Sequence, residues 1–141
     1  MPDREIHVDR RKRRSDEVRQ AITYQLEHLA EEYNLENLTL GDNNGILIAC
    51  AGRQSAGEAL AAYAPVFRRH LDRGQRELIM DKLGTLLPGV DGKSLDVRRF
   101  ELQGDDHYLC VVGEQRLCRQ ANLYRAVTGI RRIVRDTATA A

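Results

Sequence analysis

The sequence is poor in several residue types that mark particular protein classes. It has no tryptophan, and aromatic residues make up 5% of its 141 residues. No apolar run approaches the ~18 residues that a membrane-spanning helix needs, so we expect none. The three cysteines, Cys50, Cys110 and Cys118, are odd in number and widely spaced, which argues against a disulfide framework. With charged residues where a signal peptide would be apolar, this pattern predicts reduced thiols in a cytoplasmic protein.

What the sequence does contain is typical of one globular domain. Its length falls within the usual ~100–150 residues. Hydrophobic residues make up 42% and charged residues 30%, above the usual ~25%. The net charge is only +1, from 22 basic and 21 acidic residues. A balance this even argues against a surface devoted to nucleic acid, so we expect no such partner.

The two ends of the chain are predicted to lie outside the domain. Residues 1–14 form a polar segment that includes the basic run Arg10–Arg14, which we interpret as a solvated, disordered tail. Charge alone would let this run attract anionic partners, but no aromatic residue stands within it for stacking on bases. Residues 15–136 form the predicted domain, and residues 137–141 a frayed end.

Two β-hairpins are predicted. The first joins 35–40 to 46–51 through Gly41-Asp42-Asn43-Asn44-Gly45, because Asn and Gly tolerate the positive φ of tight turns. Its second strand does not alternate with polar residues, so both of its faces must be covered. The second hairpin joins 95–103 to 107–113 through a turn at 104–106.

Three amphipathic helices accompany the hairpins. The first begins at Ser15 and ends at Asn34. The second begins with a capping box at Ser55 and ends at Gly74, and Pro65 predicts a kink or break near 61–64. Residues 75–87 are predicted to be helical in their first part. The last helix spans 115–135 and has a wide apolar arc, which includes Leu117, Ala121, Tyr124, Val127, Ile130, Ile133 and Val134.

No pattern in the sequence predicts catalysis, a metal or a cofactor. Gly92-Lys93-Ser94 resembles the end of a phosphate-binding loop, but Leu87 stands where that motif needs its first glycine. The cysteines and His107 lack the close Cys pair of zinc sites. Asp42, Asp105 and Asp106 lie in turn clusters, where Asp bonds its own backbone. We therefore interpret all of these residues as structural.

The order of these elements and their residue patterns resemble those of the roadblock/dynein light chain family. The segment Leu38-Thr39-Leu40-Gly41-Asp42-Asn43-Asn44-Gly45-Ile46-Leu47-Ile48-Ala49-Cys50-Ala51-Gly52 resembles the family's first hairpin. The helix with Glu58-Ala59-Leu60-Ala61-Ala62-Tyr63, the hairpin through Tyr108–Gly113 and the closing helix follow in the family's order.

The resemblance implies a roadblock/profilin-like α/β fold of the α+β type. Its antiparallel sheet would have five strands with helices on both faces, in the order α-β-β-α-(β)-β-β-α. The third of these strands would lie within Leu83–Val90 or be missing.

The resemblance also implies a function. Members of the family form dimers through their second helices and edge strands, lack catalytic residues, and act as scaffolds or regulators of Ras-like small GTPases, frequently in bacteria. We therefore expect a cytoplasmic, non-enzymatic homodimer that binds a small GTPase. The positions that match the dimerising helix are Ala59, Tyr63, Val66, Phe67 and His70.

A small-molecule sensor domain of GAF or PAS type is the alternative. Such domains are also antiparallel sheets with helices. A sensor would need a pocket beside its sheet, lined by residues such as Phe100 and Tyr108.

Overall fold

The computed structural model describes residues 2–67, 72–87 and 94–139. Four helices and four strands occur in these ranges. In chain order they are α1 (Pro2–Glu32), β1 (Asn37–Gly41), β2 (Leu47–Ala51), α2 (Gln54–Phe67), α3 (Arg73–Leu86), β3 (Leu95–Leu102), β4 (Asp105–Val112) and α4 (Arg116–Thr139).

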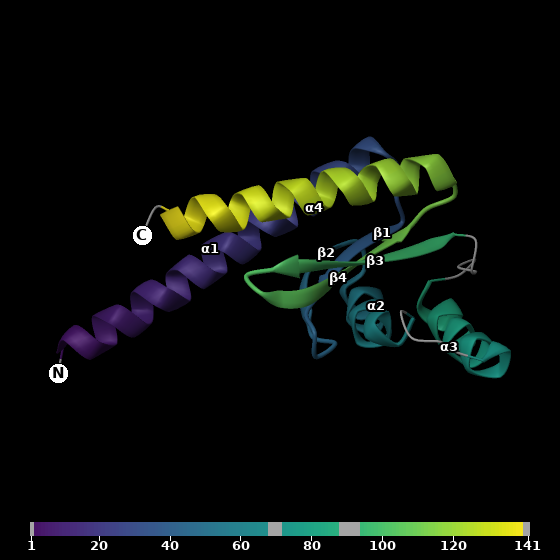
Figure 1. The fold of residues 1–141 in the computed structure, drawn as a ribbon, viewed down its shortest axis with the longest axis horizontal. Coiled ribbons are helices and arrows are strands. Elements are labelled where there is room, and N and C mark those ends of the chain that lie inside the picture. The colour runs from purple at the N-terminus through teal and green to yellow at the C-terminus, as the bar shows by residue number, and fades with distance from the viewer. Residues whose placement is uncertain (1, 68–71, 88–93, 140–141) are drawn as a thin grey trace.

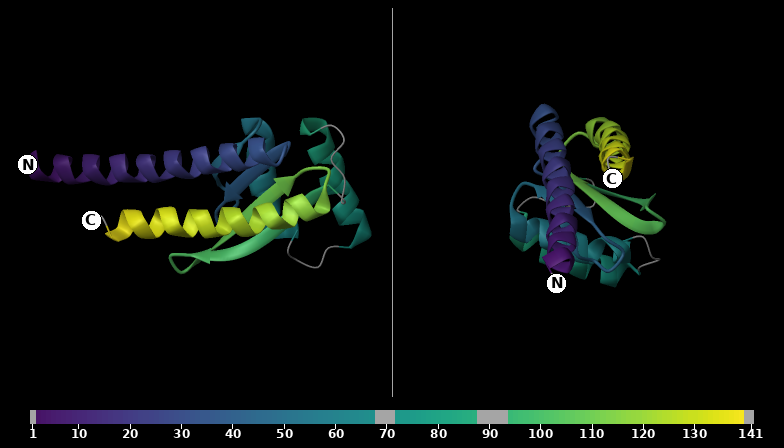
Figure 2. Two further views of the ribbon diagram at one scale, coloured as in Figure 1. Left: turned by 90° about the horizontal axis from the view of Figure 1, so that it is seen from above. Right: turned by 90° about the vertical axis from the view of Figure 1, so that its left-hand side faces the viewer.

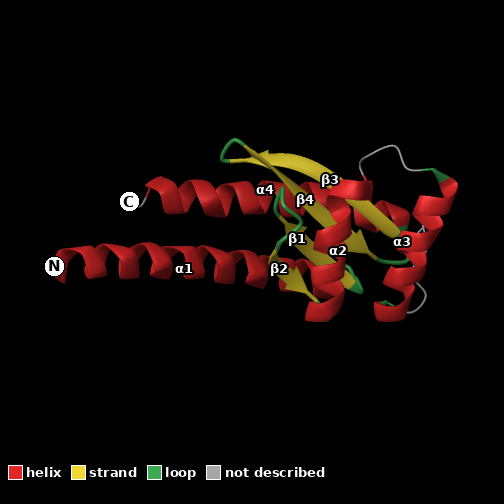
Figure 3. Cartoon of the chain, turned by 90° about the horizontal axis from the view of Figure 1, so that it is seen from below, coloured by secondary structure: helices red, strands yellow, loops and turns green. Residues whose placement is uncertain are grey.

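The elements form three layers around one sheet. The strands lie in the order β2-β1-β4-β3, and every neighbouring pair is antiparallel. Helices α1 and α4 run side by side in opposite directions over one face, and α2 and α3 cover the other (Figures 1 and 3). The N-terminal part of α1 projects beyond the sheet and beyond the end of α4 (Figure 2). The mixed α/β class with helices on both faces is therefore confirmed.

Five strands were expected, and the described residues form four. Within the expected range of the additional strand, Leu83 to Leu86 belong to helix α3, and residues 88–90 lie outside the described ranges. The described part of the expected range, 83–87, therefore contains no strand.

The sheet separates two apolar cores because its central strands are apolar on both faces. In β4, Leu109 and Val111 pack against α1 and α4, whereas Tyr108, Cys110 and Val112 pack against α2 and α3. Edge strand β2 contacts both α1 and α2. This confirms that its lack of alternation reflects cover on two sides.

Side-chain and backbone geometry explain the two hairpin turns. In the first, Oδ1 of Asp42 accepts hydrogen bonds from the backbone N–H groups of Asn44 and Ile46, and Gly45 has φ 78°. In the second, Gln103 and Gly104 both have positive φ, as a two-residue type I′ turn requires. Asp105 and Asp106 therefore begin β4 instead of forming the turn, and Asp106 pairs with Arg99 across the strands.

Helix α1 begins at Pro2, whereas the sequence predicted a disordered tail up to residue 14. Proline suits the first position of a helix, and the charged residues that follow are mostly good helix formers. No glycine or second proline interrupts the segment. At the other end, α4 continues through residues 137–139, which were expected to fray. The proposed boundaries of the domain at 15 and 136 remain a prediction.

The second predicted helix is two helices in the structure. Helix α2 ends at Phe67, two residues after Pro65, and no break interrupts 61–64. Helix α3 begins after Asp72, whose side chain accepts from the N–H of Gln75 while Gln75 reaches back to the Asp72 N–H. Gly74 thus lies in the first turn of a helix and does not end one, because this capping box starts a new helix.

None of the helices in the described ranges is both long and apolar enough to cross a membrane.

Candidate partner-binding surface on helix α2

Helix α2 lies close to the sheet because small residues meet across the contact. Its buried positions are Ala56, Gly57, Leu60, Ala61 and Ala64. A Cβ added to Gly57 would lie 2.9 Å from the Cβ and Sγ of Cys50, and one added to Gly41 would lie 2.9 Å from the Cβ of Ala61. A larger residue at either glycine would push the helix away from the strands, so these two glycines fix the height of α2 above the sheet.

Two of the three cysteines lie under this helix. Thr39 is paired with Cys50 on one neighbouring strand and with Cys110 on the other, so the three form a row across the sheet. Burial raises the pKa of the Cys110 thiol from its ordinary value of 9.0 to about 12, and its S–H faces the backbone carbonyl of Leu60 at 3.8 Å. Burial, with the charges of Glu58 and Glu27, also raises the pKa of Cys50. Both thiols are therefore neutral packing groups at ordinary pH.

The residues expected to bind a partner lie at the margin of this core. Ala59, Tyr63, Val66 and Phe67 are all half-buried and pack against the cluster that α2 and α3 form with the sheet. His70, the fifth expected residue, lies outside the described ranges. The structure brings the four together on one helix, where each combines a core contact with an exposed part.

The outward side of α2 carries almost no charge. From Ala59 to Phe67 the helix has no ionisable side chain other than that of Tyr63, and Ala62 is exposed within this stretch. A helix that is apolar around most of its circumference is normally covered on all sides. The outer face of α2 is therefore built like a contact surface.

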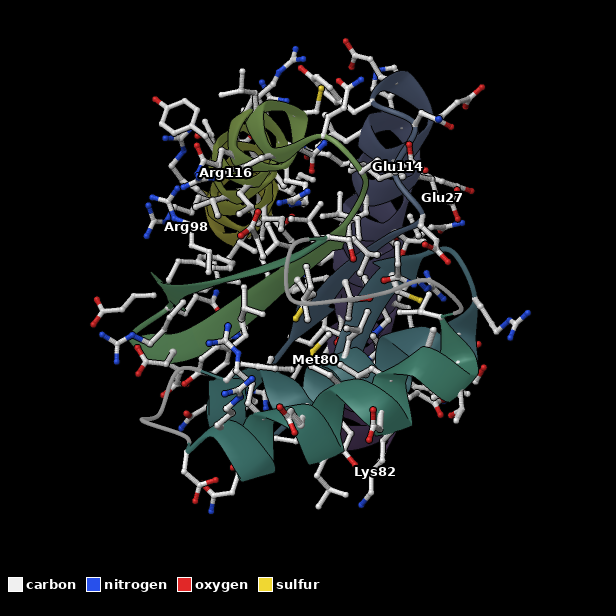
Figure 4. The ribbon with its side chains drawn as sticks, turned by 90° about the vertical axis from the view of Figure 1, so that its right-hand side faces the viewer. Glu27, Met80, Lys82, Arg98, Glu114 and Arg116 are labelled. Carbon is white, nitrogen blue, oxygen red and sulfur yellow. The ribbon has the colours of Figure 1, made fainter. Side chains whose placement is uncertain are left out.

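Helix α3 flanks α2 and covers it on one side only. Ile79, Leu83 and Leu87 join the same core. Met80 lies on the side of α3 that faces the sheet, and Lys82 points away from the molecule (Figure 4). The outer face of α3 is mixed in charge, with Arg73 paired to Glu77, and thus differs from the uncharged face of α2 beside it.

Other groups considered from the sequence have structural roles or lie apart. Asp42 holds its own turn, as described above. Cys118 lies on α4, on the far side of the sheet from Cys50 and Cys110, and contacts Gln115. In the part of the chain that the structure describes, no three His, Cys, Asp or Glu side chains are grouped as metal ligands would be. Gly92 and Lys93, which resemble the end of a phosphate-binding loop, lie outside the described ranges.

A second exposed apolar surface, on α1 and α4, was not expected from the sequence. Leu117, Ala121 and Tyr124 were predicted to share one apolar arc with Val127 and Ile130. In the structure Val127 and Ile130 are buried, whereas the first three are exposed. The width of that arc was the available signal, because a helix on a sheet buries only one stripe.

Comparison with known proteins supports the architecture. No family profile and no curated protein sequence matches the chain. Among solved structures, Myxococcus xanthus MglB is similar, with a TM-score of 0.54, 15% sequence identity, and coverage of 84% of this chain and 91% of that one. MglB is a roadblock/longin-like protein. The chain thus has a roadblock-like fold, as its sequence pattern indicated.

Proposed function

We propose that two copies of this chain pair through helix α2, and that the dimer binds and regulates a Ras-like small GTPase. The chain would act by surface complementarity, biasing the conformation of its partner, and would supply no reacting group of its own. The uncharged outer face of α2 is the observation that carries this proposal. We expect the dimer to act in the cytoplasm.

Pairing through α2 accounts for the half-buried state of its residues. Tyr63, Val66 and Phe67 already contact the core on one side, so a second copy would bury the parts that remain exposed. A two-fold axis brings the same patch of both copies together, and such self-complementary patches are usually apolar.

The proposal of a GTPase partner rests on the likeness to MglB. That protein is a GTPase-activating protein of MglA, and its fold covers most of this chain. A roadblock-like regulator needs no catalytic residue of its own if it acts by holding its partner in one conformation.

A sensor function is not favoured by the two residues that were expected to line its pocket. Phe100 belongs to the core beneath α1 and α4, and Tyr108 to the core beneath α2 and α3. Both are buried, on opposite faces of the sheet, so they do not line a common cavity.

Light scattering with two variants of α2 tests the dimer. The wild-type chain should have twice its 16.0 kDa mass, and Phe67→Asp should return it to a monomer because a carboxylate would lie unpaired in an apolar contact. Since Phe67 also touches the core, Ala62→Arg tests the same face at an exposed position. Leu78→Arg, at an exposed leucine of α3, is the matched control and should stay dimeric. A monomeric wild type, or an Ala62→Arg variant that stays dimeric, would refute the pairing.

Affinity capture from the native cell tests the GTPase. The wild-type chain should recover a Ras-like GTPase at both low and high salt, because apolar contacts resist salt. Nucleic acid recovered only at low salt would instead indicate that the Arg10–Arg14 run governs binding.

A further inference from the structure

A groove runs between α1 and α4 on the side of the molecule opposite α2. It has a volume of about 520 Å³, and its walls include Tyr24, His28 and Glu32 from α1 and Tyr124, Arg125 and Arg132 from α4. The two helices approach each other closely at its floor, where the side chain of Gln25 occupies the space that a side chain at Gly129 would fill. The groove, called the α1–α4 groove below, is thus set by the packing of two long helices.

Large apolar side chains stand exposed in this groove and on the part of α4 that precedes it. Tyr24 is 60% exposed, Tyr124 66% and Leu117 81%. Leu117, Ala121, Tyr124 and Thr128 follow one another at intervals of three or four residues, so they form one exposed stripe along α4. Three of the five large apolar residues most exposed in the described ranges therefore lie on this one face. Such clustering is typical of a surface that another molecule covers.

The walls of the groove are already held in place. The hydroxyl of Tyr24 accepts a hydrogen bond from Nε2 of Gln20 at 2.9 Å. Arg125 lies over the ring of Tyr33, donates to its hydroxyl, and pairs with Glu32. Side chains fixed in this way lose little conformational entropy when a partner binds.

The lining of the groove has a small excess of positive charge, with Arg125 and Arg132 against Glu32. Helix α4 as a whole carries six arginines and one acid, Asp136, although one of the six, Arg119, is buried and paired with Asp96. In the groove itself, Glu32 is engaged by Arg125 and lies 3.7 Å from His28. Arg132 lines the groove with no ion-pair partner among the described residues. A partner that fits this surface therefore brings acidic groups.

We propose that the α1–α4 groove binds an amphipathic, acidic helix of another protein. Leu117 and Arg132 are fifteen residues apart on α4, and a helix rises ~1.5 Å per residue, so the surface is about 22 Å long and fits about four turns of a partner helix. Apolar residues of that helix would contact Leu117, Tyr24 and Tyr124, and its Asp or Glu residues would pair with Arg132. This is the groove mode of helix recognition.

A second copy of this chain is a poor occupant of the groove. The other described helix with a large exposed apolar residue is α3, which carries Leu78. Its cations Arg73, Arg76 and Lys82 outnumber its acids Glu77 and Asp81, so it would meet the arginines of α4 with like charge. Because the groove and α2 lie on opposite faces of the sheet (Figure 1), a partner helix and the proposed dimer would not compete.

Selection of displayed peptides tests this proposal. A library of fifteen-residue peptides with randomised side chains is selected against the full-length protein, and the binding of the best peptide is measured by fluorescence anisotropy. We expect apolar residues at three- and four-residue intervals with acids between them. Tyr124→Ser should weaken binding by at least about tenfold, the range of a hot-spot residue. Leu78→Ser, the same kind of change at an exposed leucine on the other layer, should leave it unchanged.

Charge reversal distinguishes specific recognition from nonspecific hydrophobic binding. The acidic peptide should bind the Arg132→Glu variant several-fold more weakly than it binds the wild type. A peptide with lysines in place of the acids should bind that variant more tightly than it binds the wild type. The proposal is overturned if selected peptides are basic, or if Tyr124→Ser leaves the affinity unchanged. It is equally overturned if Leu78→Ser weakens binding as much as Tyr124→Ser.

Cross-linking in the cell identifies the natural occupant. A photoreactive amino acid is placed at Tyr124, and in a control at Leu78. We expect the first position alone to link to a segment of another protein that is rich in Asp or Glu and apolar at helical spacing. A link from position 124 to this chain itself, or to a segment without acids, would contradict the proposed partner.

Discussion

The two helical layers of this molecule differ in composition although they cover the same sheet. Helices α1 and α4 are long and rich in charge, and their mean hydropathy is below that of α2, whose last nine residues carry no charge. The α1–α4 layer meets the sheet through large residues such as Leu26 and Ile130, whereas α2 meets it through Gly57, Ala61 and other small residues. The outer surface of the first layer is charged, apart from the exposed apolar residues Tyr24, Leu117 and Tyr124, whereas the outer surface of α2 is uncharged along its last nine residues.

This difference indicates where a partner is needed. A helix with charged residues on its outer side is stable against water without further cover. An uncharged helix held close to the sheet presents its backbone and small side chains as a smooth surface, which a second helix can approach closely. The proposed dimer therefore uses α2, and the α1–α4 layer remains free for a partner that recognises charge.

The largest expected effects come from deleting core residues of each layer. Leu60→Ala in α2 and Leu26→Ala in α1 remove fully buried side chains, so each should lower the free energy of unfolding by about 2–5 kcal/mol. Both values can be measured by urea denaturation. If Leu26→Ala cost far more than Leu60→Ala, the α2 layer would not be an integral part of the folded unit.

Alanine substitutions at glycines should distinguish the two layers more clearly by their effects on stability. Gly41→Ala meets both the Cβ and the Cα of Ala61, so it should destabilise the protein by about 1–3 kcal/mol. Gly129→Ala meets only the end of the flexible Gln25 side chain and gains helix propensity of up to ~1 kcal/mol. We expect that variant to be as stable as the wild type or slightly more so. Gly84→Ala in α3, with nothing within 4 Å, is the control for propensity alone.

Thiol reactivity gives the smallest and most local test. At pH 8 iodoacetamide should label Cys118 and leave Cys110 unmodified, as mass spectrometry of peptides would show. Because burial holds the pKa of Cys110 at about 12 against 9.0, its contribution to stability is fully present below pH 9 and falls as the pH rises from about 9 to 12. Cys110→Ala should therefore flatten that alkaline decline. Rapid labelling of Cys110 in the native protein would mean that α2 does not cover it.

Much of this architecture could be predicted from the sequence because local signals and tertiary contacts agree. The Asp42–Gly45 cluster predicted one hairpin, and the non-alternating apolar run at 46–51 required cover on both faces. The Val18, Ile22, Leu26 and Leu29 spacing placed one face of α1 in the core, as observed. In each case one residue pattern allowed one arrangement.

Other features depend on contacts that are distant in sequence. Arg119 is buried and binds Asp96 at 2.7 Å and the carbonyl oxygen of Gly113 at 2.7 Å, which ties α4 to β3. No local pattern distinguishes that arginine from the exposed ones beside it. The capping box at Asp72 was overlooked because Gly74 suggested a helix end. The division of the α4 arc between core and solvent depended on how much of it the sheet could cover.

Site-specific cross-linking on α2 tests the central claim most directly. Ala62 lies near the midpoint of α2, so antiparallel pairing about a two-fold axis would bring the two copies of this residue together. In a Cys118→Ser background, Ala62→Cys should form a covalent dimer on mild oxidation, and Leu78→Cys should not. A chain that forms no dimer through position 62, or links as readily through position 78, would contradict the account.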